Sequence, residues 1–167
     1  HPRQHRPPDD QHAARERRDA IGRREVRRPR EPRAVLVGRD GEIKQIGAEL
    51  QRAREGRASV IRISGDPGIG KTALLDITEE QATRSGMSVV RLTAVESESG
   101  IPSSALDLLL ERLGHRSGTS GSPAALLEAL SHASREGPLA VLVDDTQWLD
   151  DRSMAALAFA CRRLLAD

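Results

Sequence analysis

The sequence has few of the residues on which several classes of protein depend. It contains one cysteine, Cys161, and two aromatic residues, Trp148 and Phe159. No apolar run approaches the roughly 18 residues that a bilayer-spanning helix needs. A lone cysteine excludes a disulfide framework and a cysteine-based zinc fold, so we expect a soluble protein of the reducing cytoplasm. The scarcity of aromatics disfavours proteins that stack nucleic-acid bases, and it predicts an aliphatic core.

The net charge of +1 conceals a strong asymmetry along the chain. Residues 1–33 carry 11 arginines, six acidic residues and several prolines, but only two large aliphatic residues. Such a segment cannot bury enough apolar surface to offset its ordering entropy. We therefore predict a disordered Arg/Pro-rich arm over 1–33 and a folded domain over 34–167. An arm that binds nucleic acid or anionic lipid is the alternative, although the composition favours a solvated tail.

From residue 34 onwards, β-rich apolar runs alternate with helical periodicity, which is typical of an α/β domain with a parallel sheet. Asp40 is expected to cap the first helix and Gly56 to end it. The apolar run Leu139–Val143 predicts a strand that is buried on both faces. After a short apolar run at 34–37, strands are predicted at 59–64, 87–95 and 139–143, and helices at 42–54, 71–84, 103–113, from 123 onwards and 152–165.

The clearest motif lies between the strand predicted at 59–64 and the helix predicted at 71–84. It matches the phosphate-loop (Walker A) pattern G-x-x-x-x-G-K-[ST] in full. Its residues are Gly65, Asp66, Pro67, Gly68, Ile69, Gly70, Lys71 and Thr72. The glycines let backbone N–H groups turn inwards as an anion-binding nest, and the following helix adds its positive end. We expect Lys71 to act on the phosphates of ATP or ADP and the Thr72 hydroxyl to bind Mg²⁺.

A second motif follows the apolar run at 139–143. There an apolar strand delivers Asp144 and Asp145 at its carboxyl end, where open parallel sheets place their ligands. Two aspartates after a strand are also a common turn signal, but the upstream phosphate loop favours a Walker B element. We predict that Asp144 holds Mg²⁺ and that Asp145 is the catalytic residue that polarises the attacking water.

Three stretches of the sequence resemble the ATPase module of the large ATP-binding LuxR-type transcriptional regulators. They are Leu36-Val37-Gly38-Arg39-Asp40 with Glu42, the phosphate loop, and Asp144-Asp145-Thr146-Gln147-Trp148-Leu149-Asp150 with Ser153. That family belongs to the signal-transduction (STAND) branch of AAA-related P-loop NTPases, and its module is origin-recognition-like. The resemblance covers residues 34–167 and implies that Val37, Gly38 and Arg39 lie beside the adenine.

The resemblance also implies a doubly wound parallel sheet in which a later strand lies between the Walker A and Walker B strands. That strand, the lid and the DNA-binding helix-turn-helix of such regulators have no counterpart before Asp167. We therefore expect an N-terminal fragment with an incomplete sheet, poor stability and little hydrolysis. Trp148 is expected to pack the loop after the Walker B strand, and Asp150 to cap the last helix.

These observations predict a regulatory module that binds Mg-ATP and hydrolyses it slowly, as a conformational switch. The expected partners are ATP, an inducer ligand or protein, and the downstream signalling and DNA-binding domains of a parent chain. Membrane binding and direct DNA contact by this segment are not expected, and self-association stays open. One alternative is a small-molecule kinase that uses the same loop. Another is a nucleotide-binding interaction module without hydrolysis.

Overall fold

The computed structural model describes residues 38–115 and 121–166. The predicted arm over 1–33, the apolar run at 34–37 and most of the loop after residue 114 lie outside the described residues. The elements in chain order are α2 (Asp40–Arg54), α3 (Lys71–Arg84), β1 (Ser88–Thr93), α4 (Ser104–Arg112), α5 (Pro123–Arg135), β2 (Leu139–Asp144) and α6 (Asp151–Leu164). Short 3-10 turns at Glu96–Glu98 and Thr146–Trp148 follow the two strands. This order confirms the predicted α/β class.

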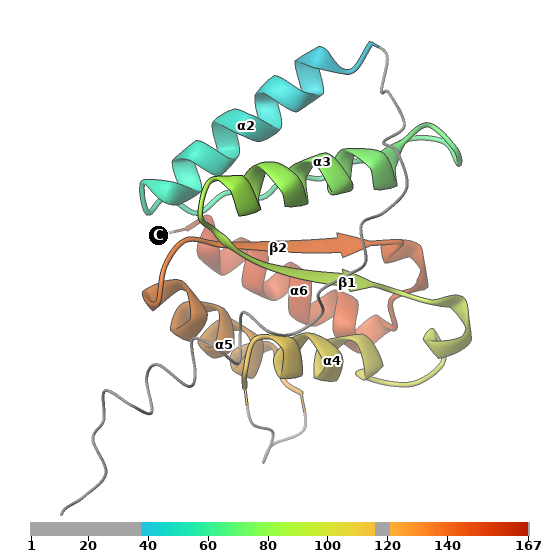
Figure 1. Ribbon diagram of the computed structural model, residues 1–167. Coiled ribbons are helices and arrows are strands. Elements are labelled where there is room, and N and C mark those ends of the chain that lie inside the picture. The colour runs from blue at the N-terminus through green and yellow to red at the C-terminus, as the bar shows by residue number, and fades with distance from the viewer. Residues whose placement is uncertain (1–37, 116–120, 167) are drawn as a thin grey trace, which may run out of the picture. The chain divides into compact units, whose positions relative to one another are not determined.

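The two strands form a parallel sheet between two layers of helices. β1 and β2 pair in register from Ser88 opposite Leu139 to Thr93 opposite Asp144. Helices α2 and α3 lie over one face of the sheet, and α4, α5 and α6 lie on the other side (Figure 1). Helices on both faces agree with a doubly wound arrangement. A sheet of two strands in the described part is consistent with the expected incomplete fold.

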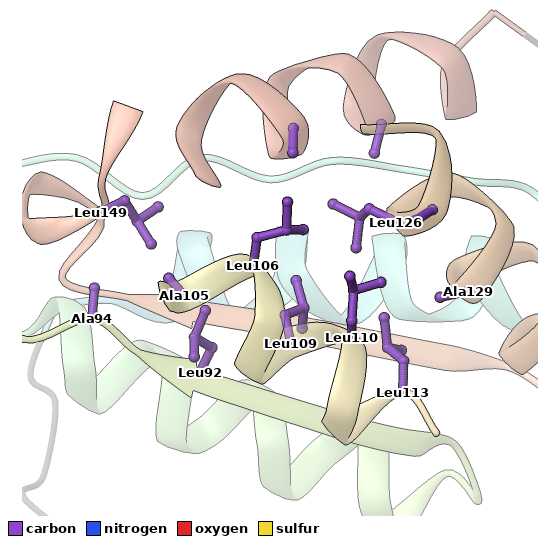
Figure 2. Close-up of a cluster of buried hydrophobic side chains, with 13 residues drawn as sticks. Leu92, Ala94, Ala105, Leu106, Leu109, Leu110, Leu113, Leu126, Ala129 and Leu149 are labelled. Carbon is purple, nitrogen blue, oxygen red and sulfur yellow. The ribbon is translucent and has the colours of Figure 1, made fainter. Parts of the chain in front are cut away.

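The main core lies between the sheet and the layer of α4, α5 and α6. Its largest buried side chains are leucines, and Figure 2 shows those of α4 lying between Leu92 of β1 and Leu126 of α5. The fully buried leucines are Leu92, Leu106, Leu109, Leu110 and Leu126. The predicted aliphatic core is therefore confirmed, and Trp148 packs against it as a partly buried side chain.

Successive side chains of each strand point to opposite faces of the sheet, so they contact two different clusters. Val90 and Val141, which are paired in register, contact the main core. Val89 and Ala140, one residue earlier on each strand, contact a smaller cluster with Ala82 of α3. Because side chains alternate between faces, Arg91 and Asp144 share the face of Val89 and Ala140, toward α3. The expectation that β2 packs on both faces is confirmed.

Helix boundaries follow the sequence signals closely, with one exception. The helix predicted at 71–84 is found with the same bounds, and Gly56 ends α2 in the left-handed conformation, with φ of 81°. Ser122 accepts a hydrogen bond from the Ala125 backbone as the N-cap of α5. Asp40 is not the cap of α2, because the helix already includes it and Arg39 occupies the N-cap position. Asp40 instead places a negative charge in the first turn, where the helix dipole favours it.

The strand predicted at 59–64 is wrong. These residues are neither helix nor strand, and Val60 and Ile61 are 45% and 39% exposed. A strand exists only when a neighbour supplies a ladder of hydrogen bonds, and β-branched residues cannot replace that neighbour. In the described part of the chain the sheet consists of β1 and β2 alone. None of the helices there has the length and hydropathy of a bilayer-spanning segment.

Candidate functional site

The phosphate loop leads directly into α3, and its backbone geometry suits an anion. Gly68 and Gly70 have φ of 81° and 95°, which is the left-handed region that glycine enters without steric cost. Gly70 is the N-cap of α3 and supplies no side chain to the first turn. Of the α-helices that the structure describes, α3 is the one that lacks both a side-chain cap and an acidic residue in its first turn. Its positive end is therefore left uncompensated by the chain.

Lys71 lies across this loop rather than extending into solvent. Its Nζ donates hydrogen bonds to the carbonyl oxygens of Gly65, at 2.9 Å, and of Asp66, at 3.0 Å. Thr72, the next residue, is exposed. A Cβ on Gly65 would lie 3.0 Å from Cγ2 of Ile69, so a larger residue there would require the Ile69 side chain to shift. The sequence motif therefore places an ammonium and a hydroxyl at one helix start.

Arg39 is brought to the same loop from a distant part of the sequence. Its Nη2 lies 3.4 Å from the carbonyl oxygen of Ile69, and its Nη1 donates to Oε1 of Glu42 at 2.5 Å. This hydrogen bond from Arg39 lowers the pKa of the Glu42 carboxyl. The Arg39 side chain thus reaches the edge of the phosphate loop. Val37, another residue expected beside the adenine, lies outside the described residues.

The two aspartates after β2 have different surroundings. Asp144 is buried; its Oδ1 accepts from the Asp145 backbone at 3.0 Å, and its Oδ2 accepts from Nη2 of Arg91 at 3.3 Å. Asp145 is less buried and has φ of 54°, a left-handed conformation that is uncommon for a residue with a side chain. Gln147 donates a hydrogen bond to its carboxylate at 3.0 Å. Strained backbone of this kind concentrates at functional sites.

Arg91 is the residue of this region that the sequence analysis missed. Its Nη1 donates to Asp76, at 2.5 Å, and to Glu79, at 2.8 Å, both on α3. Burial opposes the charge on Arg91, but the hydrogen bonds to these two carboxylates raise the pKa of the guanidinium, which stays charged. The available signal was an arginine within the apolar run Val89-Val90-Arg91-Leu92. A charge at such a position needs partners.

Asp150 and Ser153, part of the stretch that resembles the regulators, have a structural role in this fold. Oδ1 of Asp150 accepts from the backbone N–H groups of Arg152 and Ser153 at the start of α6, and from that of Ser103 before α4. The Ser153 hydroxyl donates to Asp150 and accepts from the Leu106 backbone at 2.9 Å. Asp150 therefore caps α6, as predicted, and also joins it to α4.

The residues of the loop and of the β2 end fit a magnesium nucleotide in their chemistry. Mg²⁺ prefers oxygen ligands and is commonly held by one or two protein groups together with substrate phosphates. Asp144 and Thr72 provide a carboxylate and a hydroxyl of this kind, and the uncapped start of α3 provides N–H donors. Among residues 38–115 and 121–166, no three His, Cys, Asp or Glu side chains form a metal-binding group.

Comparisons with known proteins agree with this arrangement. The chain is similar to the uncharacterized protein R02095 of Rhizobium meliloti (strain 1021), with 26% identity over 175 residues. That similarity covers 76% of this chain but only 17% of the relative's length. No solved structure matches the chain. The family described as "AAA ATPase domain" matches residues 35–165, which include the phosphate loop, both strands and all the described helices. The chain therefore belongs to the AAA ATPase domain family.

Proposed function

We propose that the chain is a regulatory module that binds Mg-ATP and hydrolyses it slowly, so that its nucleotide state changes the conformation of attached domains. The observation that carries the proposal is the phosphate loop before α3, with left-handed glycines and a helix start that the chain itself does not cap. Membership of the AAA ATPase domain family supports nucleotide binding. The switch role rests on the resemblance to LuxR-type regulators, and it requires a longer parent protein.

The roles of the residues follow from their places around the loop. The backbone N–H groups of the phosphate loop, to which Pro67 contributes none, bind the phosphates, and Lys71 exchanges its bonds with the loop carbonyls for the β- and γ-phosphate oxygens. Thr72 and Asp144 would hold the cation, which would neutralise charge on the phosphates. Asp145 orients and polarises the attacking water. The resemblance assigns Val37, Gly38 and Arg39 to the adenine, and the contact of Arg39 with Ile69 supports this role for Arg39.

Slow hydrolysis is expected because many ATPases have a glutamate at the position of Asp145 to polarise the attacking water. The side chain of aspartate is shorter than that of glutamate. The partners that the proposal assigns are ATP, an inducer, and signalling and DNA-binding domains elsewhere in a parent chain. A LuxR-type transcriptional regulator is the parent that the resemblance favours. A reducing cytoplasm is the location that best suits the single cysteine.

The test is the affinity of the 167-residue chain for fluorescent ATP and ADP analogues, with γ-phosphate release measured in parallel. Lys71→Ala should weaken nucleotide binding by roughly 10- to 100-fold, because the loss of a hydrogen bond to a charged group changes affinity by about that factor. The chain has one other lysine, Lys44, an exposed residue of α2. Lys44→Ala removes the same charge away from the loop and should leave the affinity unchanged. Equal affinities for all three proteins would contradict the proposal, and rapid phosphate transfer to a small acceptor would favour a kinase.

A further inference from the structure

Arg91 is a buried charge in the middle of a strand, and its position needs an explanation. It belongs to β1, its side chain is 8% exposed, and it lies on the face of the sheet that is turned toward α3. A guanidinium that loses its water is costly unless carboxylates replace that water. The arrangement of those carboxylates indicates what the residue does.

The two terminal nitrogens of Arg91 contact different elements. Nη1 contacts Asp76 and Glu79, which are three residues apart on one side of α3. Nη2 contacts Oδ2 of Asp144 at the end of β2. Arg91 therefore links the helix that begins at the phosphate loop to the carboxylate of the Walker B strand. A planar guanidinium can hold two such partners in fixed directions, which the single ammonium of a lysine cannot.

The distances also show how the charge is shared. The contacts with α3 are 2.5 Å and 2.8 Å, whereas the contact with Asp144 is 3.3 Å. One guanidinium meets three carboxylates, so the two carboxylates of α3 already compensate its charge. Asp144 is thus held in place by Arg91, while the charge of Arg91 is directed mainly at Asp76 and Glu79 and leaves Asp144 available to a cation. Without Asp76 and Glu79, the Arg91 charge would be directed mainly at Asp144 and would compete with that cation.

We infer that Arg91 is a positioning residue that, held by Asp76 and Glu79, orients Asp144 and thereby sets how strongly Mg²⁺ contributes to nucleotide binding. The inference rests on the proposed function, because it takes Asp144 to be a cation ligand. It assigns a task to three residues of β1 and α3 that lie outside both sequence motifs. Partners of metal ligands commonly change metal affinity by about 10- to 100-fold when they are removed.

The experiment separates the Mg²⁺-dependent part of nucleotide binding from the rest. Affinity for a fluorescent ATP analogue is measured on the 167-residue chain in EDTA, and then as Mg²⁺ is titrated. The test protein is Asp76→Asn/Glu79→Gln, beside each single variant. The control is Glu49→Gln/Glu55→Gln, which removes two negative charges from side chains that pair with Arg52 and Arg57. Arg91→Lys keeps the buried charge without the forked geometry.

The midpoint of the titration is the Mg²⁺ concentration that gives half of the gain in nucleotide affinity. The double variant should raise this midpoint by about tenfold or more, while its affinity in EDTA stays at the wild-type value. The single variants and Arg91→Lys should shift this midpoint in the same direction, and the control should not shift it. A parallel loss of affinity in EDTA would overturn the inference, because it would mark a structural role alone. An unchanged midpoint in nucleotide-binding variants would also overturn it. A wild-type chain that binds no nucleotide in either condition would overturn the proposed function itself.

Discussion

At the scale of a single residue, the fold holds Asp145 in a backbone conformation that residues with a side chain rarely adopt. This residue follows β2 with φ of 54° and ψ of 42°, where Cβ lies close to the neighbouring carbonyl oxygen. The chain turns here from the strand into the 3-10 turn at Thr146–Trp148, and this turn leads to the cap of α6. The strain is therefore imposed by the route of the chain after β2.

Replacing Asp145 by alanine or by glycine deletes the same side-chain contact with Gln147, so the difference between the two variants reports backbone strain. Asp145→Gly should be more stable than Asp145→Ala by about 1 kcal/mol, because glycine adopts this conformation freely. Urea unfolding measures the difference. At Asp151, which is exposed and helical, the order should reverse, since alanine favours a helix. An Asp145→Ala protein as stable as its glycine counterpart would contradict the strain.

Asp150 predicts a specific dependence of stability on pH. Burial raises the pKa of its carboxyl, but hydrogen bonds from the Ser153 hydroxyl and from three backbone N–H groups outweigh burial and lower the pKa below its usual range. A lowered pKa in the folded state stabilises the protein above about pH 4 and loses that effect as pH falls through the folded-state value. Urea unfolding between about pH 2 and pH 6 tests this.

Asp150→Asn should cost about 1–2 kcal/mol near neutral pH and should flatten the acid-side loss of stability. Asp151→Asn is the matched control, because Asp151 is the exposed neighbour in the first turn of the same helix. Asp151→Asn should leave unchanged the decrease in the free energy of unfolding at acid pH. An Asp150→Asn protein with the wild-type slope would show that another carboxylate governs acid unfolding.

At the scale of elements, residues 59–64 and β2 contrast most clearly. Both are rich in β-branched or aliphatic residues, but β2 pairs with β1 along its length, whereas residues 59–64 have no ladder. Amide hydrogens in a paired strand exchange only when the strand opens. Hydrogen exchange should therefore be fast at Val60 and Ile61 and much slower at Ala140 and Leu142, whose N–H groups face β1. Comparable protection in both segments would show that residues 59–64 pair in solution.

At the scale of the whole molecule, nucleotide binding should be visible as stability. The described core is aliphatic and the sheet has two strands, so the chain is expected to be only marginally stable. A ligand that binds only the folded state adds about 2.7 kcal/mol at 100 times its dissociation constant. Mg-ATP should therefore raise the midpoint of thermal unfolding in a concentration-dependent way, and Lys71→Ala should abolish most of this rise. An equal rise with Lys71→Ala would contradict binding at the loop.

Local chemistry let the sequence determine the helices and the phosphate loop. The α3 boundaries, the ending of α2 at Gly56, the caps at Ser122 and Asp150 and the aliphatic core all follow from signals within a few residues of each position. Caps, turns and helical periodicity depend on neighbours in the chain, and such features can be read without a tertiary structure. The family of the chain was accessible for the same reason, since the loop motif is contiguous.

Only the tertiary structure decided the features that need a partner distant in sequence. Residues 59–64 have the composition of a strand but lack the neighbour that would make them one. Arg91 reads as an anomaly in an apolar run until α3 and β2 bring Asp76, Glu79 and Asp144 to it. Arg39 meets the phosphate loop across 30 residues in the same way. Hydrogen-bond ladders and ion pairs depend on where elements pack, and that packing is a property of the whole fold.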